Sequence, residues 1–149
     1  MRDIRISINK DEVYEEVAKT TAYIGGKSLD ANGKSLYDQM FVTDADRDML
    51  EGYWNTAIGD VSVALDSVLA FENSDSGEEE TFGLRVSNLF KESLIKTLKS
   101  SIFSYVVNKI VAGWCSVVAP DKVEYYELVS KTHLAKIGEI IYARKRPTR

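Results

Sequence analysis

The sequence predicts a mainly α-helical domain, a bundle of four main helices with two short β-strands in the order β-α-loop-α-β-α-α. Three observations carry this prediction. Apolar side chains recur at helical spacing in four long segments, and they alternate with polar side chains in two short segments. A stretch rich in turn-forming residues separates the first two helices. With 149 residues, of which 44% are hydrophobic, the chain is expected to form a single domain over residues 1–149.

The first strand and the first helix are expected at the N-terminus. Three isoleucines alternate with polar residues over positions 4–8, a pattern typical of a half-buried strand. Asn9 precedes Glu12 by three residues, which is the spacing of a capping box. A helix is therefore predicted over about residues 10–24, and the glycine pair at 25–26 is expected to end it.

A long loop is expected over residues 25–43, with the sequence GGKSLDANGKSLYDQMFVT. It is rich in turn formers, and its Asn32-Gly33 dipeptide is typical of a tight turn. A loop of this length in a compact domain usually has a function or packs against a surface. We interpret it as an arm that binds this subunit or its neighbour through its apolar side chains, which are Leu36, Tyr37, Met40 and Phe41.

The second helix is predicted to begin between Thr43 and Asp46 and to run to about Phe71, as the longest helix of the chain. Its glycines, Gly52 and Gly59, are expected to permit a close helix crossing. An acidic turn follows over residues 72–80. The second strand is then expected from alternating residues over 82–86, and it should pair either with the first strand or with a strand of another chain.

The third and fourth helices are expected to form the C-terminal part of the chain. The third spans roughly residues 90–117, and beyond Ile102 it is apolar on every side, which is typical of a helix buried in a core or an interface. Ala119-Pro120-Asp121 breaks the chain and starts the last helix. That helix leads into a basic tail at residues 144–149, whose cations are Arg144, Lys145, Arg146 and Arg149.

Charge is distributed unevenly along the chain. Residues 1–80 hold 7 basic and 18 acidic side chains, a net charge of −11, whereas residues 81–149 hold 12 basic and 5 acidic ones, a net charge of +7. One interpretation is that both halves are simply solvated faces. The alternative is a polar subunit, in which the acidic face of one copy meets the basic face of the next. Such heterologous contacts close into rings or extend into filaments.

The sequence contains few residues suited to catalysis or metal binding. Cys115 is the single cysteine and His133 the single histidine, so a nucleophilic pair would have to join these two, and Cys115 lies in an apolar context that disfavours its thiolate. The acidic stretch lacks the ligand spacing of a calcium loop, and neither a P-loop nor a dinucleotide fingerprint is present. We therefore predict no enzyme activity, no cofactor and no metal site. With no long apolar run and no secretory leader pattern, we also predict no membrane contact.

Three segments carry a resemblance to known proteins. They are DEVYEEVAKTTAYIG (residues 11–25), TDADRDMLEGYWNTA (43–57) and IIYARKRPTR (140–149), about a quarter of the chain. They resemble a family of small proteins encoded among the virion-structure genes of phages and prophages of gut Bacteroidales. Within that setting, the chain is similar to the head–tail connector (adaptor) proteins of tailed phages. These are small, mostly helical proteins that form rings beneath the portal, and they dock on neighbouring rings through an extended arm or tail.

The resemblance implies a structural protein of the phage neck, made in the bacterial cytoplasm and incorporated into the virion. Its expected partners are sister subunits in a homo-oligomeric ring, the portal, and other neck or tail proteins. A DNA contact would not be sequence-specific, because the pI near 5.1 is unlike that of a dedicated DNA reader. Two alternatives stay open: a tail-completion protein, and a cytoplasmic accessory or DNA-packaging protein with salt-sensitive DNA binding.

Overall fold

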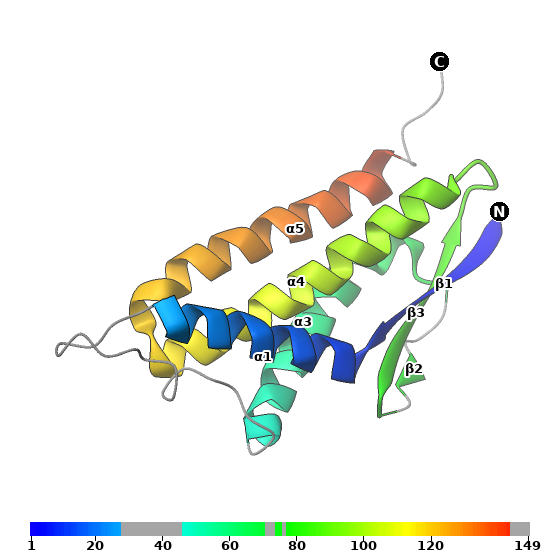
Figure 1. Cartoon of the computed structure of the whole chain (residues 1–149). Helices are drawn as coiled ribbons and strands as arrows, with labels where there is room; N and C mark the ends of the chain where they lie inside the picture. Colours follow the sequence, from blue (N-terminus) through cyan, green and yellow to red (C-terminus); the bar gives the residue numbers. More distant parts are fainter. Residues whose placement is uncertain (28–45, 71–73, 76, 144–149) are drawn as a thin grey trace, which may run out of the picture.

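The computed structural model describes residues 1–27, 46–70, 74–75 and 77–143 (Figure 1). The predicted mainly α fold with four main helices and short strands is confirmed. The strands are β1 (Arg2–Asn9), β2 (Ser74–Asp75) and β3 (Glu79–Val86). The helices are α1 (Lys10–Lys27), α3 (Arg47–Leu65), α4 (Glu92–Val118) and α5 (Val123–Ala143), with short 3-10 turns at Asp66–Val68 and Pro120–Lys122.

The two predicted strands pair with each other. β1 and β3 are antiparallel, with Ile6 opposite Phe82, and both side chains are at most 1% exposed because they face the helices. On the other face of the sheet, Arg85 forms an ion pair with Asp3 at 3.0 Å. β3 begins at Glu79, earlier than predicted, and β2 pairs with its first half, so part of the expected acidic turn belongs to the sheet. The strand order is β1-β3-β2.

Helix α4 is the centre of the molecule. It packs against α1, α3, α5 and β1, and α5 runs back antiparallel along it (Figure 1). Its buried side chains occur on every face after Leu98, as predicted for a core helix. By length and composition α4 is also apolar enough to cross a membrane, although Lys109 interrupts its apolar sequence. Core helices of globular proteins share this property, and 56% of the apolar stretch is buried here.

The start of α1 agrees with the prediction, and its end does not. The backbone N–H of Glu12 donates a hydrogen bond of 2.9 Å to the Asn9 side-chain oxygen, which caps the helix. The helix then continues through Gly25 and the next glycine to Lys27. Among the described glycines only Gly77 has a positive φ, so the pair at 25–26 does not form the left-handed cap that would have ended α1.

Helix α3 is shorter than predicted and is not the longest helix. It ends at Leu65 after 19 residues, whereas α4 has 27. Beyond the 3-10 turn, Leu69 forms a bridge with Leu84, and the Ala70 N–H donates to the Gly83 carbonyl at 2.9 Å. The backbone N–H of Ala70 therefore forms its hydrogen bond with β3 and not with a further turn of α3.

Two predicted features lie outside the described residues. The apolar arm residues Leu36, Tyr37, Met40 and Phe41 belong to residues 28–45, and the basic tail, Arg144, Lys145, Arg146 and Arg149, belongs to residues 144–149. The structure does place the ends of the helices that lead to them. The last described turn of α5 lies beside the start of α4, at one end of the bundle (Figure 1).

Candidate functional site

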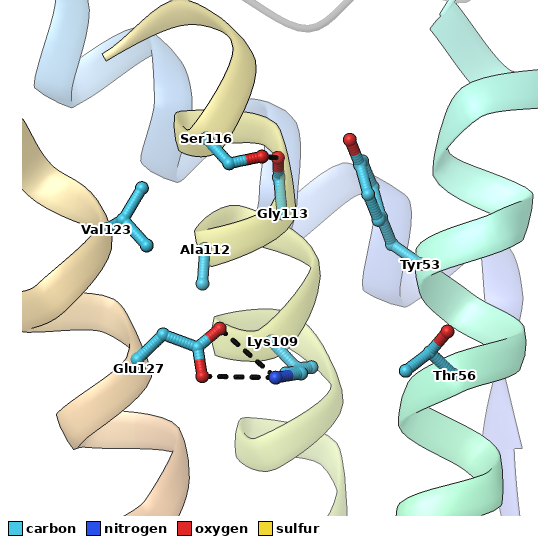
Figure 2. A pocket seen from close by; sticks show the side chains of 8 residues that line it. All are labelled: Tyr53, Thr56, Lys109, Ala112, Gly113, Ser116, Val123 and Glu127. Carbon is cyan, nitrogen blue, oxygen red and sulfur yellow. Dashed lines mark hydrogen bonds and ion pairs between the residues drawn. The ribbon is translucent and has the colours of Figure 1, made fainter. Parts of the chain in front are cut away.

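A groove between three helices is the first candidate site (Figure 2). It has a volume of about 230 Å³. Helix α3 forms one wall, α5 the other, and the second half of α4 lies between them. The lining residues are Tyr53 and Thr56 from α3, Lys109, Ala112, Gly113 and Ser116 from α4, and Val123 and Glu127 from α5.

An ion pair closes the groove on the α5 side. The Lys109 ammonium lies 3.1 Å from each carboxylate oxygen of Glu127, and both side chains are about one-quarter to one-third exposed, at 26% and 32%. Each charge is therefore already paired, and the remaining surface is formed by short or apolar side chains. A groove of this kind suits an aliphatic side chain of a protein partner better than a charged small molecule.

The shape of the groove depends on a close approach between α3 and α4. A Cβ atom added at Gly113 would lie 2.6 Å from Cδ1 of Tyr53, because the ring of Tyr53 lies directly on the α4 backbone. The expected close crossing at Gly52 and Gly59 is wrong, since an added Cβ at either glycine meets nothing within 4 Å. The glycine that allows the crossing belongs to α4, and it acts by accommodating an aromatic ring.

Gly113→Ala should displace Tyr53 and reshape this groove. We expect the free energy of unfolding to fall by about 1–2 kcal/mol, because the overpacking penalty exceeds the gain in helix propensity. Gly59→Ala is the matched control: the helical position is open, so the free energy of unfolding should rise by up to about 1 kcal/mol. Urea denaturation measures both changes. Equal effects of the two substitutions would contradict the role assigned to Gly113.

A second hollow lies where α1 and α3 begin and β3 approaches them. It has a volume of about 470 Å³ and is lined mostly by charged side chains. We call it the acidic hollow, since four of its side chains are carboxylates and two are cations. The lining residues are Lys10, Asp11, Tyr14, Arg47, Asp48, Glu51, Gly77 and Glu78.

The floor of the acidic hollow is a partly buried hydrogen-bonded cluster around Glu51. Lys10 is only 9% exposed, and its ammonium lies 2.8 Å from Glu51 Oε1 and 5.3 Å from the centroid of the Trp54 ring. The Tyr14 hydroxyl donates to Glu51 Oε2 at 3.1 Å. Burial, with the nearby negative charge of Glu51, raises the pKa of Tyr14, so the phenol keeps its proton and remains a donor.

The rim of the acidic hollow carries the charges that face solvent. Arg47 forms an ion pair with Asp11, and its guanidinium lies 5.0 Å from the centroid of the Tyr14 ring. Asp48 and Glu78 are exposed as well. The rim therefore has more carboxylates than cations, and it can attract a cationic partner segment.

Cys115 and His133 are not brought together. Burial raises the pKa of the Cys115 thiol to about 11, which keeps the sulfur protonated at neutral pH. Tyr126 of α5 lies close to Cys115: burial raises the pKa of the Tyr126 phenol, and the nearby Cys115 raises it further. His133 lies seven residues further along α5, roughly 10 Å away along the helix axis. Across the described residues, no group of three or more His, Cys, Asp or Glu side chains is arranged to hold a metal ion.

Sequence reasoning missed the three-helix groove, although one signal was present. Lys109 is the only charged residue between Lys99 and Asp121, in an otherwise apolar helix. A lone charge there needs a partner from another element, and that partner is Glu127. No comparable signal marks Tyr53 and Gly113, since their contact arises only when α3 crosses α4.

Comparison with known proteins identifies no relative of this chain. No protein-family model matches the chain, and neither a curated protein nor a solved structure matches it. The groove, the acidic hollow and the charge distribution are therefore the features from which a function can be argued.

Proposed function

We propose that this protein is a structural phage virion protein, a head–tail connector or adaptor that assembles as a ring in the neck. It would act through protein–protein contacts between the acidic side of one copy and the basic end of the next. The resemblance of residues 11–25, 43–57 and 140–149 to small virion-structure proteins supports the setting. The separation of acidic and basic surfaces is the observation that carries the mechanism.

The acidic side is formed by α1 and the start of α3. Four carboxylates are exposed in the first turns of α1, at Asp11, Glu12, Glu15 and Glu16. They extend the rim of the acidic hollow, where Asp48 of α3 is exposed too. Opposite charges would set the register of subunits and speed their encounter more than they would raise the affinity.

The basic end is formed by the start of α4, where Lys91, Lys96 and Lys99 are exposed. The last described turn of α5 lies beside it (Figure 1), and residues 144–149, which contain four cations, follow that turn in the sequence. Surfaces of opposite charge on different parts of one subunit permit head-to-tail contacts, which form a ring where the rotation between subunits closes.

Mass spectrometry of density-banded particles from an induced host tests this proposal. The banded particles are compared with the soluble fraction of the same cells. The proposal expects this chain in the particles at a fixed low copy number. A chain found only in the soluble fraction would overturn the neck assignment and favour a cytoplasmic accessory protein.

The partner then separates the two structural alternatives. Crosslinking in the particle should join a connector to the portal, whereas a tail-completion protein would be joined to tail proteins. A DNA-packaging accessory protein would instead bind DNA with a strong salt dependence.

A further inference from the structure

One apolar side chain stands out at the basic end of the molecule. Leu89 is 78% exposed, in the tight turn between β3 and α4. The turn is held by two hydrogen bonds, from the Phe90 N–H to the Ser87 carbonyl at 3.0 Å and from the Leu89 N–H to the Ser87 hydroxyl at 3.2 Å. Val86 and Phe90 on either side are 3% and 2% exposed, so the core anchors both ends of the turn. Leu89 is therefore an apolar knob presented in a fixed position.

The three-helix groove lies toward the other end of the same helix. Gly113, in the groove, follows Glu92, the first residue of α4, by 21 positions, which corresponds to roughly 30 Å. Leu89 cannot reach the groove of its own subunit. With about 230 Å³, the groove has room for a leucine side chain, and its Ala112 and Val123 provide apolar contact.

We propose that Leu89 of one copy inserts into the three-helix groove of a second copy, and that this knob-and-groove contact joins subunits head to tail. The knob and the groove are different surfaces of one chain, so the contact is heterologous; an open oligomer keeps a free knob at one end and a free groove at the other, and a closed ring keeps neither. This inference deepens the proposed function, because it rests on self-assembly and names the residues that make the contact.

Charge complementarity favours a second copy as the occupant. Lys91 is exposed two residues after Leu89, and the exposed Lys96 and Lys99 follow on α4. The groove is flanked on α5 by the exposed Glu124, whereas Glu127 is already paired with Lys109. Seating Leu89 in the groove would therefore bring the exposed lysines of one copy toward the Glu124 carboxylate of the next, which favours one orientation of the incoming subunit.

Site-directed crosslinking tests the contact directly. The double variant Asn88→Cys/Thr56→Cys keeps Leu89 and carries one thiol at the exposed position beside the knob and one in the groove, and a short bismaleimide reagent should link it into a ladder of dimers, trimers and larger species. A mixture of the two single variants should stop at dimers. The wild-type chain is the background control, since its buried Cys115 thiol has a pKa of about 11 and stays unreactive at neutral pH.

A second measurement tests the energetics in solution. Leu89→Glu should weaken self-association about tenfold to a hundredfold in sedimentation velocity, the effect of losing one buried leucine. Val63→Glu is the matched control, since Val63 on α3 is also 78% exposed and the variant has the same net charge. Its association should be unchanged, and thermal unfolding by circular dichroism checks that both variants fold.

The outcomes separate this inference from the proposed function. Each of three results would overturn the knob-and-groove contact. The double variant could give no ladder, the wild-type chain could stay monomeric at every concentration, or Leu89→Glu and Val63→Glu could have equal effects on association. If the chain were nevertheless present in banded particles, the virion assignment would stand without this contact. A ladder with no chain in the particles would retain the contact and overturn the neck assignment.

Discussion

Replacing Arg144, Lys145 and Arg146 together with glutamate is expected to abolish self-association and leave the fold intact. The three residues supply most of the positive charge of the tail, and the proposed contact sets that charge against the acidic side of a neighbour. Reversal converts attraction into repulsion at each position. We expect the association constant to fall at least about a hundredfold, which corresponds to about 3 kcal/mol. Sedimentation velocity at physiological ionic strength measures the change.

Total charge has to be separated from the tail's own contribution. Each replacement of a cation by glutamate lowers the net charge by two, so the three replacements lower it from −4 to −10. Reversing Lys19, Lys131 and Lys136, which are exposed on α1 and α5, gives the same net charge and leaves the tail intact. This control should retain most of the association, and both variants should melt near the wild-type temperature. Unchanged association in the tail variant would remove the tail from the mechanism.

Trp54→Ala should cause a larger loss of stability than any single substitution of a residue that lines the acidic hollow, because Trp54 packs beneath it against Lys10 and Tyr14. Trp54 is 1% exposed, and its ring meets Tyr14 edge to face with centroids 6.3 Å apart. It also covers the buried Lys10 ammonium, so its removal leaves a cavity and takes a favourable cation–π contact from that charge. We expect the free energy of unfolding to fall by about 3–5 kcal/mol.

Urea denaturation measures this loss through the midpoint of unfolding. With a denaturant slope of about 1–3 kcal/mol per molar, the midpoint should fall by about 1 M or more. Val63→Ala, at an exposed position of the same helix, is the control and should stay within about 0.5 kcal/mol of the wild type. A loss below about 1 kcal/mol for Trp54→Ala would show that the cluster of Lys10, Tyr14 and Trp54 does not hold α1 on α3.

Local patterns in the sequence predict most of the secondary structure. The isoleucines of β1 point to one side because strand side chains alternate, and that side is the core. Asn9 caps α1 through a bond that needs only the three-residue spacing to Glu12. Element ends were less predictable. Gly25 can end a helix or continue one, and a choice of this kind depends on the surrounding packing rather than on the residue type.

The candidate site could be predicted only in part. The charge imbalance is a property of the sequence, and the acidic side of α1 follows from it. The three-helix groove joins residues 53–56, 109–116 and 123–127, which only the packing of three helices brings together. The exposure of Leu89 could not be predicted from the sequence either, because the residue type does not fix whether an apolar side chain in a turn faces the core or the solvent.

The helix and strand content, the capped start of α1 and the uneven distribution of charge follow from residue type and spacing along single segments. The pairing of β1 with β3, the contact of the Tyr53 ring with Gly113 and the ion pair between Lys109 and Glu127 arise only from the way the elements pack together. The same packing places Leu89 and the groove near opposite ends of α4. These features need contacts between residues far apart in the chain, and the free energy that selects such contacts comes from packing the whole core.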